Sequence, residues 1–165
     1  MTAVLAVAQR GAGILTLVAA PVTEAEYNSE WLQALVSSMQ ATMLECQGVG
    51  IAAPQIYVSK RVIIVASRPN SRYPDAPEMP AIAMINPEMI DCSEQQFWGE
   101  EGCLSVPEQR AQVARAAEIR VRFHNVNGEV FEQTFTGFPA RIVQHEIDHL
   151  NGILFVDRIA ENPLG

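Results

Sequence analysis

The spacing of apolar residues predicts an amphipathic helix in the first third of the chain. Between residues 30 and 45 the apolar positions recur at three- and four-residue intervals, with polar residues between them: Leu32, Leu35, Val36, Met39 and Met43. Thr23 and Glu26 lie three residues apart and fit a capping box, so we expect the helix to begin after Thr23. Gly48 should lie beyond its end. The methionines are interpreted as core residues rather than ligands.

The middle of the chain has the pattern of β-strands. Residues 62–65 are all β-branched and predict a buried strand. Residues 81–90 predict a second strand, interrupted at Asn86-Pro87. Apolar and polar residues alternate before Asn127-Gly128, a pair that suits a type I′ turn, so residues 117–136 are expected to form a hairpin. His124 shares the polar face of that hairpin with two arginines and is interpreted as a solvated residue rather than a metal ligand.

The helical spacing returns near the C-terminus. Pro139 suits the first turn of a helix, Gly152 suits its end, and the apolar residues between them are spaced to face a core: Ile142, Val143, Ile147 and Leu150. The apolar run 153–156 is expected to follow as a short strand. Together these patterns predict an α+β fold.

Composition narrows the class of protein. The 165 residues, 48% of them hydrophobic, suggest one domain over residues 1–165. A net charge of −8 argues against a nucleic-acid-binding surface. No run reaches the roughly 18 apolar residues of a membrane span, and the apolar N-terminus lacks the basic start of a signal peptide. Three widely spaced cysteines do not form a disulfide pattern. We therefore expect a cytoplasmic protein with no nucleic-acid or membrane partner.

The segment 144–152 carries the candidate chemistry. It contains the pattern H-E-x-x-H, formed by His145, Glu146 and His149. Residues four apart lie on one face of a helix, so the two histidines can bind one metal ion while the glutamate reaches a water beside it. The alternative is a surface helix that carries two histidines by chance.

A catalytic metal site of this kind needs a third protein ligand. A third histidine at the spacing of the metzincin pattern would fall at position 155, which is Phe155, and Glu161 is the only glutamate after His149. These facts argue against the usual metallopeptidases and indicate that the third ligand lies upstream of His145. Cys103 lies in a turn-rich segment, and a thiolate is a good ligand for zinc or ferrous iron. Cys46 and Cys92 have no comparable setting.

Three separated segments together resemble the peptide deformylase family. They are residues 48–55 (GVGIAAPQ), 101–105 (EGCLS) and 144–152 (QHEIDHLNG), and the resemblance extends from about residue 21 to 158. It implies a central C-terminal helix carrying H-E-x-x-H, surrounded by antiparallel sheets, with an N-terminal amphipathic helix. It implies a metal held by Cys103, His145 and His149. It further implies that this metal is Fe²⁺ in the cell and that Zn²⁺, Ni²⁺ or Co²⁺ can replace it. The reaction removes the N-formyl group from the initiator methionine of new polypeptides and releases formate.

The resemblance also implies roles for individual residues. Glu146 would take a proton from the attacking water and pass it to the leaving amine, and the oxyanion would be stabilised by the Gln55 side chain and the Leu104 backbone N–H. The remaining implied positions contact the substrate: Val49, Gly50, Gly102, Arg110, Phe138, Arg141 and Ile142. For Asp148 two interpretations stay open, a partner for a histidine and a solvated carboxylate.

The sequence departs from the family pattern at some positions, which limits the family properties that can be expected of this chain. Gln47 stands where glutamate is frequent, which leaves a charge pair between that position and Arg110 in doubt. Some bacterial members have a long basic C-terminal helix that docks on the ribosome; no such helix follows Arg158 here, so ribosome docking stays open. The alternative functions are a zinc metallopeptidase that cleaves internal peptide bonds and a binding module that has lost catalysis. Intact Glu146 and Gln55 argue against the second.

Overall fold

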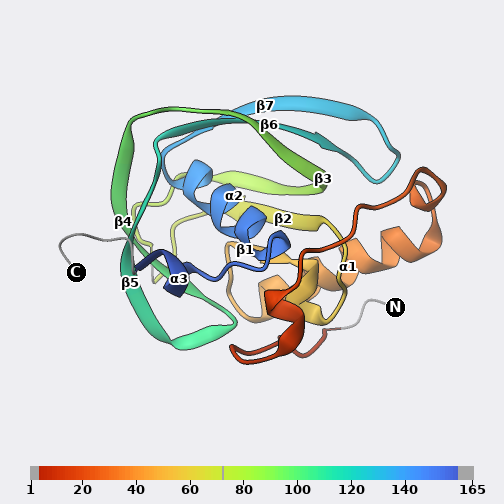
Figure 1. Cartoon of the computed structure of the whole chain (residues 1–165), viewed down its shortest axis with the longest axis horizontal. Helices are drawn as coiled ribbons and strands as arrows, with labels where there is room; N and C mark the ends of the chain where they lie inside the picture. The colour runs from red at the N-terminus through yellow and green to blue at the C-terminus, as the bar shows by residue number, and fades with distance from the viewer. Residues whose placement is uncertain (1–3, 72, 160–165) are drawn as a thin grey trace.

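The protein is organised around one buried helix, α2 (Gly137–Leu150), as the computed structural model shows (Figure 1). The structure describes residues 4–71 and 73–159, so the ends of the predicted domain, residues 1–3 and 160–165, lie outside the described residues. Every residue from Ala140 to Leu150 is buried. A helix that is buried all round belongs to the core of a protein. The predicted C-terminal helix therefore forms, and Gly152, with a φ of 76°, lies just beyond its end.

Antiparallel strands surround α2 in two sheets. The first sheet has the strand order β1-β2-β3-β6-β7, and the second pairs β4 with β5. The strands are β1 (Gly50–Ala52), β2 (Val62–Ser67), β3 (Met79–Cys92), β4 (Gln96–Cys103), β5 (Val106–Ala116), β6 (Glu118–His124) and β7 (Val130–Thr136). All of the pairings between these strands are antiparallel. Helices and antiparallel sheets occur together, which confirms the predicted α+β class.

Strand β2 is buried on both of its faces. Ile63 and Val65 belong to the core under α2, which also contains Val143 and Leu150. On the other face, Ile64 packs in a second core with helix α1 (Glu30–Glu45). A strand covered on both sides needs a continuous apolar run rather than an alternating one. This explains the four consecutive β-branched residues at 62–65.

The predicted start of α1 is wrong by about two turns. The capping box of Thr23 and Glu26 exists, but it caps a three-residue 3₁₀ turn, η2 (Glu24–Glu26). Asn28 then takes a φ of 62°, which interrupts the helical backbone, and Ser29 provides the true cap by accepting a hydrogen bond from Leu32 N. Two helix-start patterns therefore lie six residues apart, and the first of them belongs to a turn.

Three further expectations are corrected. The run after Gly152 is not a strand: α3 (Phe155–Ile159) is a short helix, and Asp157 accepts a hydrogen bond from Leu154 N at its start. Strand β3 continues through Asn86, which takes a φ of 51° at a shift of register. The hairpin β6–β7 is confirmed, but only Gly128 of the Asn127-Gly128 pair has a positive φ, so the turn is not type I′.

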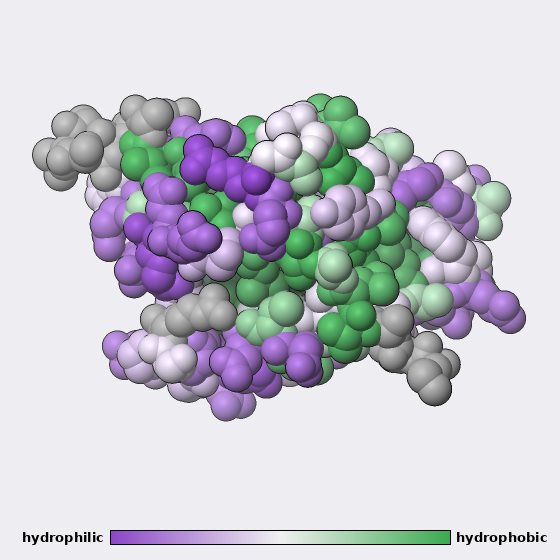
Figure 2. All heavy atoms as spheres, turned by 90° about the horizontal axis from the view of Figure 1, so that it is seen from below, coloured by the Kyte–Doolittle hydropathy of each residue, from purple (hydrophilic) through white to green (hydrophobic). Residues whose placement is uncertain are grey.

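The described surface is uneven in polarity. In the view from below, apolar residues gather along the middle of the face, and polar residues lie mainly toward its margins (Figure 2). None of the helices in the described ranges is both long enough and apolar enough to span a membrane.

Candidate active site

Three side chains that could together hold a metal ion converge at the C-terminal end of β4. Cys103 is the last residue of that strand, and His145 and His149 lie one turn apart on α2. All three are buried, and their ligand atoms lie within 4.8 Å of one another. The Cys103 Sγ and His149 Nε2 atoms are 3.3 Å apart. One thiolate and two imidazoles are a donor set that suits zinc or ferrous iron, so the residues fit the metal that the sequence predicts.

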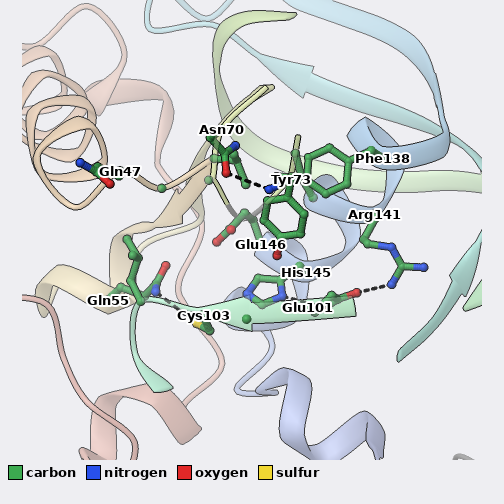
Figure 3. A pocket seen from close by; sticks show the side chains of 16 residues that line it. Gln47, Gln55, Asn70, Tyr73, Glu101, Cys103, Phe138, Arg141, His145 and Glu146 are labelled. Carbon is green, nitrogen blue, oxygen red and sulfur yellow. Dashed lines mark hydrogen bonds and ion pairs between the residues drawn. The ribbon is translucent and has the colours of Figure 1, made fainter. Parts of the chain in front are cut away.

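A buried carboxylate orients the first of the two histidines. Glu101 Oε1 lies 2.9 Å from His145 Nδ1, which leaves Nε2 to face Cys103 (Figure 3). The same carboxylate accepts hydrogen bonds from Arg115 Nε and Nη2, both at 2.8 Å, and from Arg141 Nη1 at 2.6 Å. Burial alone would raise the pKa of Glu101, but the hydrogen bonds with Arg115 and His145 hold it well below its ordinary value. Glu101 is therefore an anion fixed in place from three sides.

The Glu146 side chain is buried close to the three candidate metal ligands. Its Oε1 atom is buried and has no hydrogen-bond partner among the described residues. Burial raises the pKa of this carboxyl to about 7. A Cβ atom added at Gly50 would lie 2.5 Å from Glu146 Oε2, so glycine at that position makes room for the carboxylate. An unpartnered buried carboxyl with this pKa suits proton transfer near neutral pH.

Gln55 comes to the site from the 3₁₀ turn η3 (Ala53–Ile56), which follows β1. Its Oε1 atom accepts a hydrogen bond from Ala52 N at 2.9 Å. Its Nε2 atom donates to Ser105 Oγ at 3.1 Å and lies 3.6 Å from Cys103 Sγ. Since the oxygen is held by the backbone, the amide nitrogen must face the metal-binding side chains. Gln55 therefore presents a donor to the site.

Most of the residues predicted for the active site line one cavity. Its walls include the three segments predicted from the sequence and a loop that the sequence does not single out: Gln47, Gly48, Val49, Gly50, Gln55, Asn70, Tyr73, Glu101, Gly102, Cys103, Leu104, Phe138, Arg141, Ile142, His145 and Glu146. Figure 3 shows Tyr73 and Phe138 side by side above His145. Of the two histidines on α2, His145 lines the cavity, whereas His149 does not and is more deeply buried.

Two predicted arginines have different surroundings. Arg110 lies outside the walls of this cavity and borders a neighbouring hollow with Leu104. It pairs with Glu100 at 3.4 Å, and Gly102 makes room for it, since a Cβ there would lie 2.6 Å from Arg110 Nη1. Arg141 lines the cavity, but its guanidinium turns away to Glu101 and to the Phe97 carbonyl. Gly99 makes room for it, because a Cβ there would lie 2.8 Å from Arg141.

Both of the interpretations left open for Asp148 are wrong. Its carboxylate is buried and binds Arg115 at 2.6 Å and Arg158 at 2.8 Å. His124 is not fully solvated either, since it lies half-buried against the Tyr27 ring. Sequence reasoning missed the role of Glu101, although it lies next to Gly102 in a quoted segment. It also missed Arg115, for which no local pattern exists.

Three buried side chains that could hold a metal, a carboxylate oxygen without a hydrogen-bond partner and an amide N–H group, all in or next to one cavity, are the parts of a metal-dependent hydrolase centre. Comparison with known proteins agrees. The sequence model of the polypeptide deformylase family matches residues 4–163. Peptide deformylase 2 of Nostoc sp. is 50% identical over 131 residues, which cover 79% of this chain and 73% of the relative.

Solved structures show the same likeness. A Met-Ala-Ser-bound class I type b peptide deformylase from Acinetobacter baumannii superposes with a TM-score of 0.94 and 63% identity, covering 96% of this chain and 99% of that one. The peptide deformylase of Thermotoga maritima gives a TM-score of 0.83 and 35% identity, with 94% and 97% covered. The chain belongs to the peptide deformylase family. It is a metal-dependent hydrolase that removes the formyl group from N-terminal formylmethionine, so the resemblance seen in the sequence is confirmed.

Proposed function

We propose that this cavity deformylates nascent chains with one divalent metal ion, held by Cys103 Sγ and by the Nε2 atoms of His145 and His149. The metal is Fe²⁺ in the cell, with Zn²⁺, Ni²⁺ or Co²⁺ as substitutes. Residues 1–165 act as one domain in the cytoplasm. The observation that carries this assignment is the position of the Glu146 carboxylate. It is buried beside the three candidate metal ligands, and its Oε1 atom has no hydrogen-bond partner among the described residues.

The chain's own residues supply the proton transfers and the charge stabilisation. When bound, the metal supplies a Lewis acid that activates water and polarises the formyl carbonyl. Glu146 accepts the proton as the water oxygen adds to the formyl carbon, and it delivers this proton to the nitrogen as the C–N bond breaks. Gln55 Nε2 and the Leu104 backbone N–H donate to the oxyanion. Loss of one such donor costs about 10²–10³ in rate.

The substrate is held as an added strand. β1 is at the edge of its sheet, and its first residue, Gly50, lines the cavity together with the preceding Val49, so a peptide can pair with the open edge of β1. The methionine side chain lies among Phe138, Ile142 and the aliphatic part of Arg141. Gly102 leaves the backbone of β4 accessible on the other side, and Arg110 lies at the outer end of the peptide path. The Met-Ala-Ser peptide bound to the Acinetobacter baumannii enzyme supports this substrate class.

The test is formate release from formyl-Met-Ala-Ser by freshly prepared nickel-loaded protein. Glu146→Ala is the control, and the metal content of both proteins is measured. Formate from the native protein alone supports the reaction and the role of Glu146. No formate from native protein that holds metal would refute the proposal and favour another amide substrate or a silent binding module. Cleavage of internal peptide bonds instead would favour a metallopeptidase.

The metal assignment has its own test. Ferrous iron next to a thiolate is open to oxidation, and so is Cys103 itself. The iron-loaded protein should lose activity in air and regain it when nickel replaces the iron. Full activity of the iron form after long aeration would contradict the assignment.

A further inference from the structure

Two aromatic rings separate the active-site cavity from a second hollow. Tyr73 and Phe138 are the residues that line both the active-site cavity and a hollow whose other walls are Pro74, Asp75 and Ala76. None of Cys103, His145 and His149 lines the hollow, so the two rings stand between it and the candidate metal ligands.

The two rings pack against each other from different elements. Phe138 lies in the first turn of α2, and Tyr73 comes from the loop between β2 and β3. Their centroids are 4.6 Å apart and their planes are inclined by 46° (Figure 3). Aromatic pairs at this separation attract each other beyond the area they bury. The pair forms a continuous wall rather than two separate contacts.

Tyr73 is held in this wall from two other directions. The Arg110 guanidinium lies over the Tyr73 ring, 5.0 Å from its centre. Within the loop, Tyr73 N donates to Asn70 Oδ1 at 3.0 Å, and Tyr73 O accepts from Ala76 N at 3.2 Å. Backbone and side chain are both fixed, so the ring has a defined position in the structure.

We infer that Tyr73 is a specificity-determining residue, which together with Phe138 limits the length of the first side chain of the substrate. The inference rests on the proposed function, because it requires that the methionine side chain enter this cavity. A chain of four heavy atoms ends at the two rings. A longer chain would need the space behind them, and the intact wall excludes it.

The experiment uses formyl-peptides that differ only in the length of the first side chain. Formyl-norleucyl-Ala-Ser has the length of methionine, and formyl-2-aminooctanoyl-Ala-Ser is two methylenes longer. In Tyr73→Ala the kcat/KM ratio of the longer to the shorter peptide should rise at least about tenfold, the lower end of what a methylene contributes in an apolar pocket. Tyr73→Phe keeps the ring and should leave the ratio unchanged, as should Asp75→Ala on the far side of the wall.

Further measurements keep the test decisive. If Tyr73→Ala does not fold, Phe138→Ala removes the other half of the wall and should raise the same ratio. Binding of the two deformylated peptides, measured by calorimetry, reports the size of the pocket without turnover. If native protein releases no formate, the proposed function fails. If, in addition, Tyr73→Ala does not change the relative affinity for the two deformylated peptides measured by calorimetry, the role of Tyr73 in limiting side-chain length is refuted as well. An unchanged ratio in a folded, metal-loaded and active Tyr73→Ala protein would overturn the inference alone.

Discussion

Replacing Glu101 with glutamine should destabilise the protein strongly, although the two side chains have nearly the same size. The Glu101 carboxylate lies within hydrogen-bond distance of four nitrogen atoms: two of Arg115, one of Arg141 and one of His145. The side chain is 3% exposed, so water cannot replace a lost partner. A glutamine keeps one acceptor oxygen, and its NH₂ group turns a donor toward other donors.

The magnitude follows from the charges that remain. Removing one partner of a buried ion pair costs about 3–5 kcal/mol, because the other charge stays buried and uncompensated. In a chain of this length each kcal/mol shifts Tm by about 2–4 °C, so Tm should fall by roughly 6–20 °C. Metal affinity should also fall by about 10–100-fold, since His145 loses the group that orients it.

The assay is urea unfolding followed by circular dichroism in the presence of a chelator, which removes the contribution of metal binding to stability. Glu100→Gln is the matched control, because Glu100 is the neighbouring residue, is 52% exposed and forms an ion pair only with Arg110 among the described residues. That exposed pair should be worth less than about 1 kcal/mol. A loss below about 1 kcal/mol in Glu101→Gln would refute the reasoning, since the carboxylate would then not anchor the two arginines.

Three other changes test separate parts of the structure. Gly50→Ala places a Cβ 2.5 Å from Glu146 Oε2, so the free energy of unfolding should fall by about 1–3 kcal/mol and kcat by at least about tenfold. Gly13→Ala is the control: its Cβ would meet nothing within 4 Å, so neither quantity should change. Cys103→Ser should reduce the bound metal measured by elemental analysis, whereas substitution of the exposed Cys92 by serine should not; equal metal content in both would exclude the thiolate as a ligand. The Thr23 backbone and Lys60 lower the pKa of Glu26, so its contribution to stability is present above the ordinary value of 4.5 and is lost as the pH falls through the lowered value. In an NMR titration Lys60→Met should raise that pKa toward 4.5, and no change would show that the backbone bond acts alone.

Local patterns predicted most of the side chains that meet at the candidate site, and long-range contacts determine which other residues hold them in place. His145, Glu146 and His149 follow from the geometry of one helix, and Cys103 and Gln55 lie in short segments typical of the family. Arg115 has no such pattern: it reaches Glu101 and Asp148 only because β5 pairs with β4 and packs against α2. For the same reason the sequence could not choose a partner for Asp148.

The errors in the fold have a similar origin. Residues 153–156 are apolar enough for a strand, but they pair with no strand in the described part of the chain, and Asp157 accepts a hydrogen bond at the start of a helix instead. At the N-terminus the Thr23 and Glu26 pattern is real, yet the backbone of Asn28 moves the helix start to Ser29. Tyr73 lies in a loop rich in proline, where no periodicity marks a residue as part of a pocket.

Three glycines beside the site are required by volume and not by backbone angle. Gly50, Gly99 and Gly102 all have ordinary φ values, yet an added methyl group would lie within 3 Å of a long side chain from another element, namely Glu146, Arg141 or Arg110. Each glycine and its long neighbour therefore form a complementary pair. Shortening the neighbour should make alanine acceptable at the glycine. Among related sequences, these glycines are expected to covary with the opposing residue and to disappear only where it is smaller.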